Sequence, residues 1–316
     1  MKIVIPGGTG QVGTVLARAF TRDGHEVVVL GRHKAPAPWR VVAWDARHLA
    51  AWADELSGAD VVINLAGRSV NCRYTPANRE EIKGSRVQSV QAVGEAIASA
   101  SRPPRVWLQA STATIYAHRY DAANDEKSGL IGGGEHAPDT WRFSIDVATA
   151  WEKALDQAAT PGTRKVALRS AMIMSPDRGG ILDTLLGLVR VGLGGTAGDG
   201  RQYISWIHEA DFIRALYRLI ERDHFIGAVN LAAPQPLPNR EFMAILRHAW
   251  GVPFGLPATE WMIEIGAVFL RTETELILKS RRVVPGRLLE DGFSFDYPDW
   301  ESAARELCAR TKRGHA

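Results

Sequence analysis

The amino-acid sequence predicts an α/β protein that contains a doubly wound parallel sheet and a small, mainly helical C-terminal appendage. Three observations support this fold class. Short apolar runs alternate with helical stretches along most of the chain, a glycine-rich turn follows the first apolar run, and helical patterns prevail after about residue 253. We therefore expect one domain over residues 1–252 and a small C-terminal domain over residues 253–316.

The first elements form a βαβ unit. Residues 2–6 (Lys-Ile-Val-Ile-Pro) make an apolar run that predicts a buried strand. Residues 11–23 carry apolar side chains at helical spacing, and residues 26–30 form a second, Val-rich run. A strand, a glycine turn, a helix and a second strand within about 30 residues are typical of a parallel sheet.

The same alternation predicts the remaining elements. Further strands are expected at residues 40–44, 61–65, 106–110, 165–169 and 228–231, and further helices at residues 49–56, 77–99 and 144–158. Residues 121–140 hold four glycines and little periodicity, so we expect a long loop that is either a lid or disordered. The polar stretch 311–316 is expected to be a tail.

The glycine-rich turn consists of Gly7, Gly8, Thr9, Gly10, Gln11, Val12 and Gly13. Gly7 permits a tight turn out of the strand, and Gly13 lets the helix pack closely on the strand. Gly10 lets a pyrophosphate approach the N-terminus of the helix, where free N–H groups and the helix dipole favour an anion. Because the turn follows a strand and opens a helix, it predicts a dinucleotide-binding Rossmann fold rather than a purely structural glycine turn.

The end of the second strand bears on the choice of cofactor. NAD-binding proteins of this type carry an acidic residue there, which holds the ribose 2′-hydroxyl. This chain has Arg32 instead, followed by His33 and Lys34. One charge-assisted hydrogen bond from Arg32 to a 2′-phosphate is worth about 1.5–3 kcal/mol, which is roughly a ten- to hundredfold preference for NADP(H). Lys34 could add to the same patch, and the alternative is that Arg32 is a solvated surface side chain.

Composition limits the other partners and the location. The net charge is only +3 and no long basic run occurs, so we expect no nucleic acid. Cys72 and Cys308 are far apart, with no CxxC motif, which excludes a disulfide scaffold and favours a reducing compartment. We expect no metal site. No apolar run reaches the length of a membrane span, so we expect a cytoplasmic protein.

Five motifs resemble the extended short-chain dehydrogenase/reductase superfamily, which includes the sugar-nucleotide epimerases. In order along the chain they are residues 7–13, 44–46, 64–67, 110–116 and 198–211. The resemblance implies that Asp45 and Ala46 flank the adenine, although Asp45 could instead be only a helix cap. It also implies that Leu65, Ala66 and Gly67 line the cofactor.

A narrower resemblance covers essentially the whole chain. Residues 281–293 look like the signature of a subgroup labelled "epimerase family protein" or "cell division inhibitor", which carries a C-terminal domain of unknown function. Arg86 and Arg169 belong to further motifs shared with this subgroup, and we assign both to the cofactor site together with Ser111. Arg169 could alternatively clamp an anionic substrate with two parallel hydrogen bonds.

The chain departs from the superfamily at the reacting residues. Superfamily enzymes use Tyr-x-x-x-Lys on one helical face, where the lysine lowers the pKa of the tyrosine so that the phenol can exchange a proton. Aligned on Trp151-Glu152, this chain has Phe143 at the tyrosine position and Val147 at the lysine position. Neither side chain can move a proton, so the usual mechanism cannot be carried over.

Other side chains are candidates for catalysis. The resemblance places Thr112 on the superfamily's active-site Ser/Thr, with Ser111 beside it; both could polarise a carbonyl or only order the nicotinamide. Tyr116 is the first candidate for the missing acid, and the alternative is a packing residue. Its tuning cation could come from one of three nearby positions, Arg73, Lys83 or Arg86.

The motif at residues 198–211 lines the substrate pocket in relatives. Arg201, Tyr203 and His208 are therefore expected in the pocket. Arg201 could clamp an anion or be a surface arginine. His208 suits acid–base chemistry or is a structural residue before the helix that begins near Asp211.

Three functions are compatible with these observations. The preferred one is an NADP(H)-dependent oxidoreductase that acts on an unknown small carbonyl substrate with a non-standard proton donor. The second is a catalytically silent NADP(H)-binding regulator. The third is a sugar-nucleotide epimerase, which depends most on the missing tyrosine and lysine. By analogy with relatives, a homodimer could form through residues 77–99 and 144–158.

Overall fold

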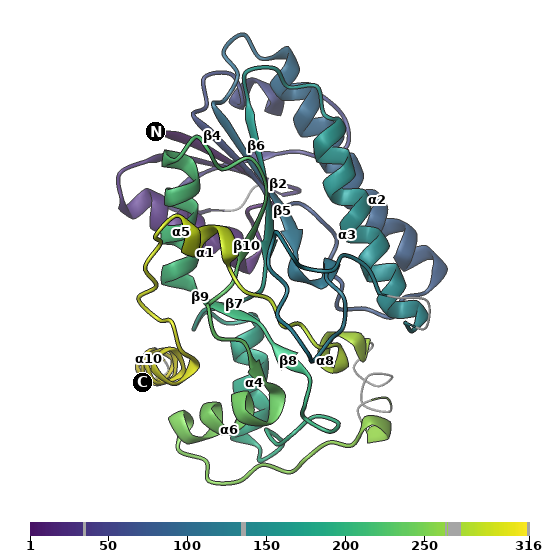
Figure 1. The fold of residues 1–316 in the computed structure, drawn as a ribbon. Coiled ribbons are helices and arrows are strands. Elements are labelled where there is room, and N and C mark those ends of the chain that lie inside the picture. Colours follow the sequence, from purple (N-terminus) through teal and green to yellow (C-terminus); the bar gives the residue numbers. More distant parts are fainter. Residues whose placement is uncertain (34–35, 134–136, 263, 265–272, 315–316) are drawn as a thin grey trace.

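The computed structural model describes residues 1–33, 36–133, 137–262, 264 and 273–314, and in this part of the chain seven parallel strands form one sheet (Figure 1). The strand order is β3-β2-β1-β4-β5-β6-β10, so the first strand lies inside the sheet and the direction of winding reverses there. The strands are β1 (Lys2–Pro6), β2 (Glu26–Gly31), β3 (Arg40–Ala43), β4 (Val61–Asn64), β5 (Val106–Thr112), β6 (Arg164–Ser170) and β10 (Gly227–Leu231). The predicted fold class is confirmed, and each predicted strand is present.

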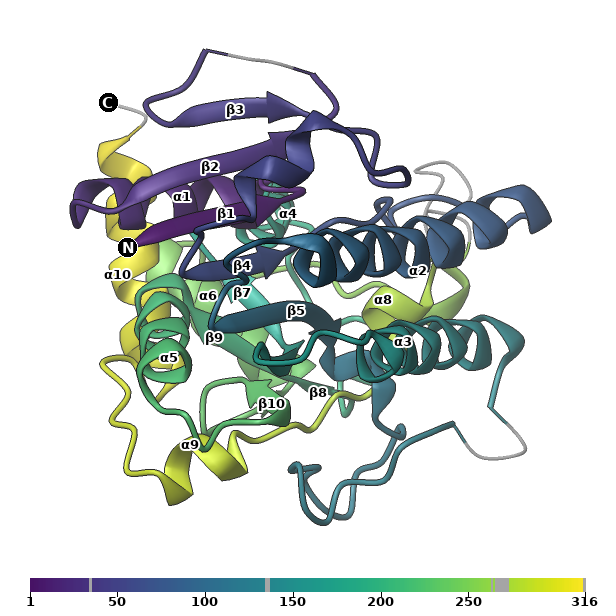
Figure 2. The ribbon, with the colours of Figure 1, turned by 90° about the horizontal axis from the view of Figure 1, so that it is seen from above.

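Helices cover both faces of the sheet (Figure 2). One face carries α1 (Gln11–Arg22) and α5 (Glu209–Glu221), and the other carries α2 (Pro76–Ser99) and α3 (Asp139–Gln157). Side chains alternate along β1, where Ile3 and Ile5 pack with α1 and α5 while Val4 packs with α2. Because both faces are buried, the strands are apolar throughout, which explains why the sequence pattern located them well.

Two predicted helices differ from the structure. The stretch predicted at residues 49–56 is a single short 3₁₀ turn, η1 (Ala51–Glu55), in which Trp52 is buried. Helix α3 begins five residues earlier than predicted, directly after Pro138 and with Asp139 in its first turn. Proline before a helix and an acidic residue in its first turn both favour a helix start.

A smaller second layer lies at the carboxyl edge of the sheet. It contains β7 (Met172–Met174), α4 (Ile181–Arg190), β8 (Tyr203–Ile204), β9 (Trp206–His208), β11 (Leu237–Pro238), α6 (Asn239–Trp250) and α10 (Trp300–Arg313). Trp300 of α10 stacks on Phe242 of α6 at 4.0 Å between ring centroids, and its indole N–H donates to the Phe242 carbonyl at 2.9 Å. The last helix therefore shares a core with residues of the preceding domain.

Three further short elements are η2 (Ala113–Ile115), α8 (Glu275–Leu278) and α9 (Gly286–Glu290). The predicted tail is partly helical, since α10 continues to Arg313 and Thr311 is buried with its hydroxyl donating to the Leu307 carbonyl. In the described part of the chain, no helix combines the length and apolar composition needed to cross a membrane.

The long loop predicted at residues 121–140 has a structural role in its described part. The Asn124 N–H donates to the Arg282 carbonyl at 2.7 Å, and the Val284 N–H donates to the Asn124 carbonyl at 3.0 Å. Asn124 is fully buried. Residues 121–133 therefore neither form a detached lid nor lack order. They hold the C-terminal segment against the sheet.

Candidate functional site

The glycine loop connects β1 to α1 and leaves room for a ligand. Gly7 has a φ of +74°, and a Cβ there would lie 2.6 Å from the Ala66 Cα. A Cβ on Gly13 would lie 2.4 Å from the Gly8 Cα, so the helix can approach the strand only with glycine there. At Gly10 a Cβ would meet nothing within 4 Å, and no side chain among the described residues caps α1. The open space at this helix N-terminus fits a pyrophosphate.

Other residues of the loop complete this cradle. Val12 packs partly into the core beneath the sheet. The side-chain amide nitrogen of Gln11 is buried and has no hydrogen-bond partner among the described residues. A buried donor without a partner is rare in proteins, and beside an open helix N-terminus it fits the binding of a polar ligand.

The end of β2 touches the glycine loop. A Cβ on Gly31 would lie 2.5 Å from the Thr9 side chain, so the next residue, Arg32, is adjacent to the cradle. Arg32 is exposed, and within the described chain its guanidinium has no hydrogen-bond or ion-pair partner. Lys34, which could add to this patch, lies outside the described residues. Arg32 is therefore free to receive a phosphate.

The turn after β3 shows that Asp45 has a local role. One carboxylate oxygen accepts the backbone N–H groups of Arg47 and His48 at 2.9 and 3.0 Å, and the other lies 2.6 Å from the His48 ring. These hydrogen bonds lower the pKa of the Asp45 carboxyl to about 2. Ala46 takes a left-handed conformation, with φ at +63°. Asp45 thus stabilises its own turn, which agrees with the alternative of a local cap.

The segment after β4 forms the opposite wall of the cradle. The Leu65 N–H donates to the Pro6 carbonyl at 2.8 Å, and the Ala66 N–H donates to the Asn64 side chain at 3.1 Å. Gly67 packs on Arg86 of α2, whose guanidinium donates to two backbone carbonyls. Burial lowers the pKa of Arg86 to about 10. Gly67 and Arg86 connect this wall to a neighbouring cavity.

The cavity lies at the carboxyl end of β5 and has a volume of about 260 Å³. Its lining residues are Val70, Tyr74, Ile82, Arg86, Ser111, Thr112, Thr114, Phe143, Ser144, Val147, Trp151 and Glu275. Phe143 and Val147, which replace the superfamily's tyrosine and lysine, both line it. The missing pair would therefore have faced this space, and the substitution makes that part of the wall apolar.

Two hydroxyl groups at the end of β5 line the cavity, as predicted, but they differ in availability. The Ser111 hydroxyl donates to Glu152 at 2.6 Å, so its proton is engaged. The Thr112 hydroxyl oxygen accepts the Thr114 N–H at 3.1 Å, at the start of η2. Because an accepted hydrogen bond leaves the O–H free, Thr112 can still donate to a ligand.

Tyr116 and Arg169 lie in a buried network rather than in the cavity. Arg169 makes a two-pronged ion pair with Glu152, at 2.8 and 2.7 Å. It also donates to the Tyr116 hydroxyl at 2.9 Å, and that hydroxyl donates to Asn230 at 2.9 Å. Tyr116 is 2% exposed and absent from the cavity lining. This placement corrects both predictions. Tyr116 is a packing residue whose hydroxyl already donates to Asn230, and the Arg169 guanidinium already binds Glu152 and Tyr116, so it cannot clamp a ligand with two parallel hydrogen bonds.

The C-terminal segment contributes groups to the cavity that the sequence analysis missed. The Ser144 hydroxyl, on α3, donates to the Glu275 carboxylate of α8. The Lys279 ammonium donates to the Thr114 carbonyl at 2.7 Å, and the Arg281 guanidinium donates to the Thr114 hydroxyl at 3.0 Å. Burial lowers the pKa of Lys279 to about 8. The only sequence signal was the family-like motif at residues 281–293, which carried no physical assignment.

Tyr74 is a second cavity residue that the sequence analysis did not single out. Its ring packs edge-on against Phe143, with 5.0 Å between ring centroids, and its hydroxyl is hydrogen bonded to Ser144. Burial raises the pKa of the Tyr74 phenol to about 12, and the nearby carboxylates of Glu273 and Glu275 add to this. Tyr74 is therefore a hydroxyl that stays protonated near neutral pH.

The three residues predicted for the substrate pocket do not line this cavity. Arg201 is exposed and lies over the Tyr120 ring at 5.4 Å. Tyr203 of β8 packs under the Arg282 guanidinium, 4.5 Å from the ring centroid. The motif at residues 198–211 thus contacts the C-terminal segment, which separates it from the cavity.

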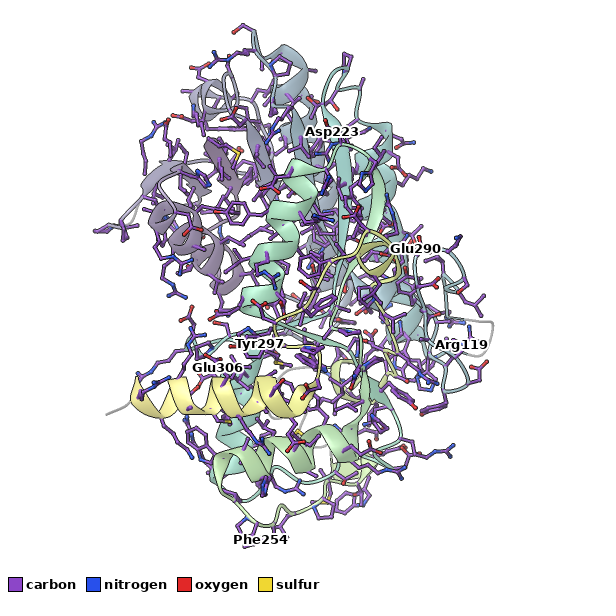
Figure 3. All side chains as sticks on the ribbon, turned by 60° about the vertical axis from the view of Figure 1, so that its left-hand side comes forward. Arg119, Asp223, Phe254, Glu290, Tyr297 and Glu306 are labelled. Atoms are coloured by element: carbon purple, nitrogen blue, oxygen red, sulfur yellow. The ribbon has the colours of Figure 1, made fainter. Side chains whose placement is uncertain are left out.

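His208 is a structural residue, as in the alternative interpretation. Its Nδ1 accepts the Ala210 N–H at 3.1 Å and so caps α5, which assigns the ring proton to Nε2, 3.0 Å from Glu306 of α10. The ring stacks on Tyr297 at 3.9 Å, and Figure 3 shows Tyr297 and Glu306 close together beside α10. His208 is 1% exposed and joins α5 to the C-terminal helix.

The substitution His208→Ala tests this role. Loss of the helix cap and of the hydrogen bond to Glu306 is expected to cost about 1–3 kcal/mol of unfolding free energy. Urea unfolding would measure this cost, and a titration with reduced dinucleotide should give the same affinity as the wild type. If His208→Ala is as stable as the wild type but binds the dinucleotide more weakly, His208 belongs to the ligand pocket and the structural role is wrong.

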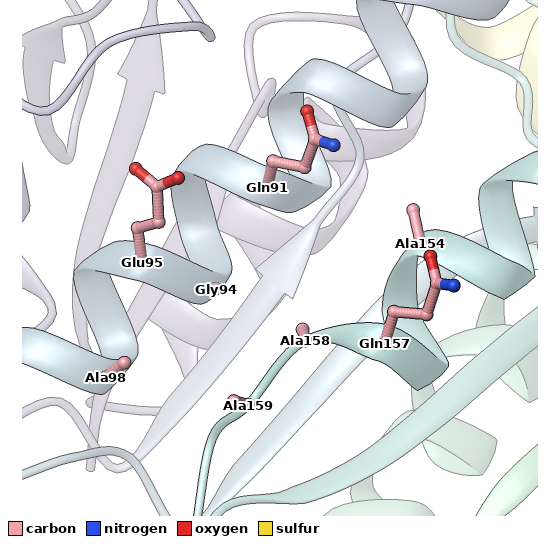
Figure 4. Close-up of a pocket in the computed structure, with 8 residues that line it drawn as sticks. All are labelled: Gln91, Gly94, Glu95, Ala98, Ala154, Gln157, Ala158 and Ala159. Carbon is pink, nitrogen blue, oxygen red and sulfur yellow. The ribbon is translucent and has the colours of Figure 1, made fainter.

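A separate hollow lies between α2 and α3 (Figure 4). It is lined by Gln91, Gly94, Glu95, Ala98, Ala154, Gln157, Ala158 and Ala159. These side chains are small or polar, and none suggests chemistry. The homodimer through these two helices stays a prediction. In the described part of the chain, no group of three or more His, Cys, Asp or Glu side chains is arranged to hold a metal ion.

Comparisons with known proteins agree with this geometry. The sequence model of the NAD dependent epimerase/dehydratase family matches residues 3–232, and that of a domain of unknown function, DUF1731, matches residues 258–307. The chain is 32% identical to the Homo sapiens epimerase family protein SDR39U1 over 314 residues, which are 98% of this chain and 100% of that protein. It is 30% identical to the Bacillus subtilis epimerase family protein YfhF over 317 residues, which are 99% of each chain.

Solved structures extend the comparison. The crystal structure of human SDR39U1 (isoform 2) with NADPH superimposes with a TM-score of 0.85 at 30% identity, and the match covers 98% of this chain and 99% of that one. UDP-N-acetylglucosamine 4-epimerase from Bacillus cereus superimposes with a TM-score of 0.75 at 17% identity, covering 99% of both chains. The second likeness concerns the fold alone.

Proposed function

The chain belongs to the NAD dependent epimerase/dehydratase family, and from this premise we propose that it is an NADP(H)-dependent oxidoreductase acting on a small carbonyl compound. The main observation in support of this proposal is that a cofactor cradle lies next to a small cavity. A glycine cradle with a free Arg32 adjoins a small cavity in which the Thr112 hydroxyl can donate to a ligand. The proton donor differs from the tyrosine and lysine of the superfamily.

The cofactor assignment rests on the cradle and on one relative. The open space at Gly10 and the free amide of Gln11 would receive the pyrophosphate, and Arg32 would receive the 2′-phosphate. The relative SDR39U1 has been crystallised with NADPH. When bound, NADPH supplies the hydride for reduction of a carbonyl carbon.

The size of the cavity supports a small substrate. At about 260 Å³ it falls below the range of about 300–1,000 Å³ that is usual for ligand pockets. Phe143 and Val147 add apolar surface to its wall, while Thr112 can donate a hydrogen bond to a carbonyl oxygen and draw electron density from the carbonyl carbon. A small carbonyl compound fits this combination better than a sugar nucleotide.

The substitution Arg32→Ala tests the cofactor assignment. In a fluorescence titration, the affinity for NADPH is expected to fall by roughly ten- to a hundredfold while the affinity for NADH is unchanged, because only NADPH carries the 2′-phosphate. Arg22→Ala is the matched control, since Arg22 is an exposed arginine at the other end of α1. Equal binding of both dinucleotides by the wild type would exclude the role given to Arg32.

A second candidate function is a catalytically silent NADP(H)-binding regulator. The apolar residues Phe143 and Val147 at the positions of the reacting pair favour it. A screen of small aldehydes and ketones for NADPH oxidation separates the two functions. A regulator would bind NADPH tightly, and none of the carbonyl compounds would cause it to oxidise NADPH. Epimerase activity is disfavoured, because removal of a proton from an alcohol depends on the missing pair.

A further inference from the structure

Glu275 is a fully buried carboxyl group that lines the cavity and comes from the C-terminal segment. One of its oxygens accepts the Ser144 hydroxyl, whose helix also carries Phe143 and Val147. The other oxygen, Oε1, is buried and has no hydrogen-bond partner among the described residues. A buried carboxylate oxygen that accepts no hydrogen bond is unfavourable unless it is protonated or a ligand donates to it.

Two cations form ion pairs with Oε1, at distances longer than a hydrogen bond. The Arg281 and Lys279 side chains lie 3.6 and 3.9 Å from Oε1, and both donate instead to Thr114. Glu273 adds a second carboxylate, and Tyr74 lines the same cavity as Glu275. Burial raises the pKa of Glu275 above its ordinary range, and Glu273 acts in the same direction. Arg281, Ser144 and Lys279 oppose the shift.

We infer that Glu275 is the proton donor of this cavity and replaces, from the C-terminal region, the tyrosine and lysine that the chain lacks. The inference rests on the proposed function and gives it a named catalytic residue. In this step the carbonyl carbon gains a hydride from NADPH, and the carbonyl oxygen gains the proton of Glu275. The carbonyl becomes a hydroxyl, NADPH becomes NADP⁺, and Glu275 is left as a carboxylate that regains a proton from water.

The surroundings suit both protonation states. Before transfer, the burial of the carboxyl group favours its neutral form, and Oε1, which accepts no hydrogen bond from the described residues, can then donate to a ligand. After transfer, Arg281, Lys279 and the Ser144 hydroxyl stabilise the carboxylate. The other acidic candidates are weaker, since the pKa of Tyr74 is raised to about 12 and the Ser144 hydroxyl is directed at Glu275.

The first test needs no cofactor or substrate. Infrared difference spectroscopy of the full-length protein through neutral pH should show the carbonyl band of a protonated carboxyl group, which disappears in Glu275→Gln. Glu273→Gln is the matched control and should keep the band, because Glu273 is a buried neighbour outside the cavity lining. Ser144→Ala should move the band's titration to higher pH, because it removes a hydrogen bond that favours the carboxylate. Absence of a Glu275-dependent band at neutral pH would overturn the inference.

The second test uses NADPH and the carbonyl compounds that the wild type reduces. Glu275→Gln is expected to lower kcat by about 10²–10⁴-fold with unchanged NADPH affinity. In the wild type, kcat should fall as the pH rises through the pKa of Glu275, since only the protonated form donates. If Glu275→Gln has the same kcat as the wild type, the inference is wrong. If the wild type reduces no carbonyl compound, the proposed function fails, while the infrared titration still decides whether Glu275 holds a proton.

Discussion

Replacing Gly13 by alanine is expected to weaken NADPH binding at least tenfold and to destabilise the fold. The added Cβ would lie 2.4 Å from both the Cα and the carbonyl oxygen of Gly8, and these are backbone atoms that cannot rotate away. Helix α1 would have to move off β1, and the glycine loop would lose its shape. The N–H groups at the start of α1 would then no longer converge on a phosphate.

The magnitudes follow from packing and from hydrogen bonding. Overpacking of this kind costs about 1–3 kcal/mol of stability. Loss of one or two charge-assisted hydrogen bonds to the pyrophosphate, at about 1.5–3 kcal/mol each, weakens binding by roughly ten- to ten-thousandfold. Urea unfolding measures the first effect, and a fluorescence titration with NADPH measures the second.

Gly10→Ala is the matched control. A Cβ at this position meets nothing within 4 Å, and Gly10 has a φ of −78° that alanine adopts readily. Stability should therefore change by less than about 1 kcal/mol, while the methyl group occupies the space in front of α1 and weakens NADPH binding. If Gly10→Ala binds NADPH as the wild type does, the pyrophosphate does not lie at this helix N-terminus.

The cofactor half of the site could be predicted from the sequence because its residues lie close together in the chain. The glycine loop, the start of α1 and Arg32 at the end of β2 fall within one βαβ unit. Their geometry follows from local spacing and from one parallel strand pair, β1 with β2. Short-range patterns are sufficient for such a unit.

The cavity at the end of β5 could not be predicted in the same way, because the contacts around it join distant segments. Ser144 and Glu275 are 131 residues apart, and Tyr116 and Asn230 are 114 residues apart. Tyr116 was chosen because it follows Thr112 along the chain. That position does not reveal that β6 and β10 bring Arg169 and Asn230 to its hydroxyl. The sequence pattern showed that the tyrosine and lysine are absent, since Phe143 and Val147 stand at their positions, but it did not indicate another proton donor.

The same reasoning explains why the C-terminal region was read as an appendage to the main domain. Its described residues interlock with earlier elements through single contacts that no periodicity signals, such as Glu306 with His208 and Val284 with Asn124. Glu275 lies on a helix of only four residues, too short to produce a recognisable pattern. In this chain the C-terminal region supplies part of the cavity wall.

The buried network around Glu152 leads to the second large effect. Glu152→Ala is expected to lower the free energy of unfolding by about 3–5 kcal/mol, because it leaves the Arg169 guanidinium buried without its counter-charge. The two side chains are only 15% and 12% exposed, so water cannot take the place of the lost partner. The Ser111 hydroxyl would lose its acceptor in the same variant.

A double variant separates the ion pair from the packing around it. Glu152→Leu combined with Arg169→Met removes both charges and keeps apolar volume, so it should recover most of the stability that Glu152→Ala loses. Urea unfolding of the single and double variants measures this recovery, with equal m values as the check on two-state behaviour. If Glu152→Ala is as stable as the wild type and binds NADPH more tightly, then Arg169 is free to hold a phosphate and the assignment to the cofactor site was correct. A large loss of stability in Glu152→Ala that the double variant recovers means that Arg169 holds the end of β6 against α3 and fixes the Tyr116 ring beneath the cavity.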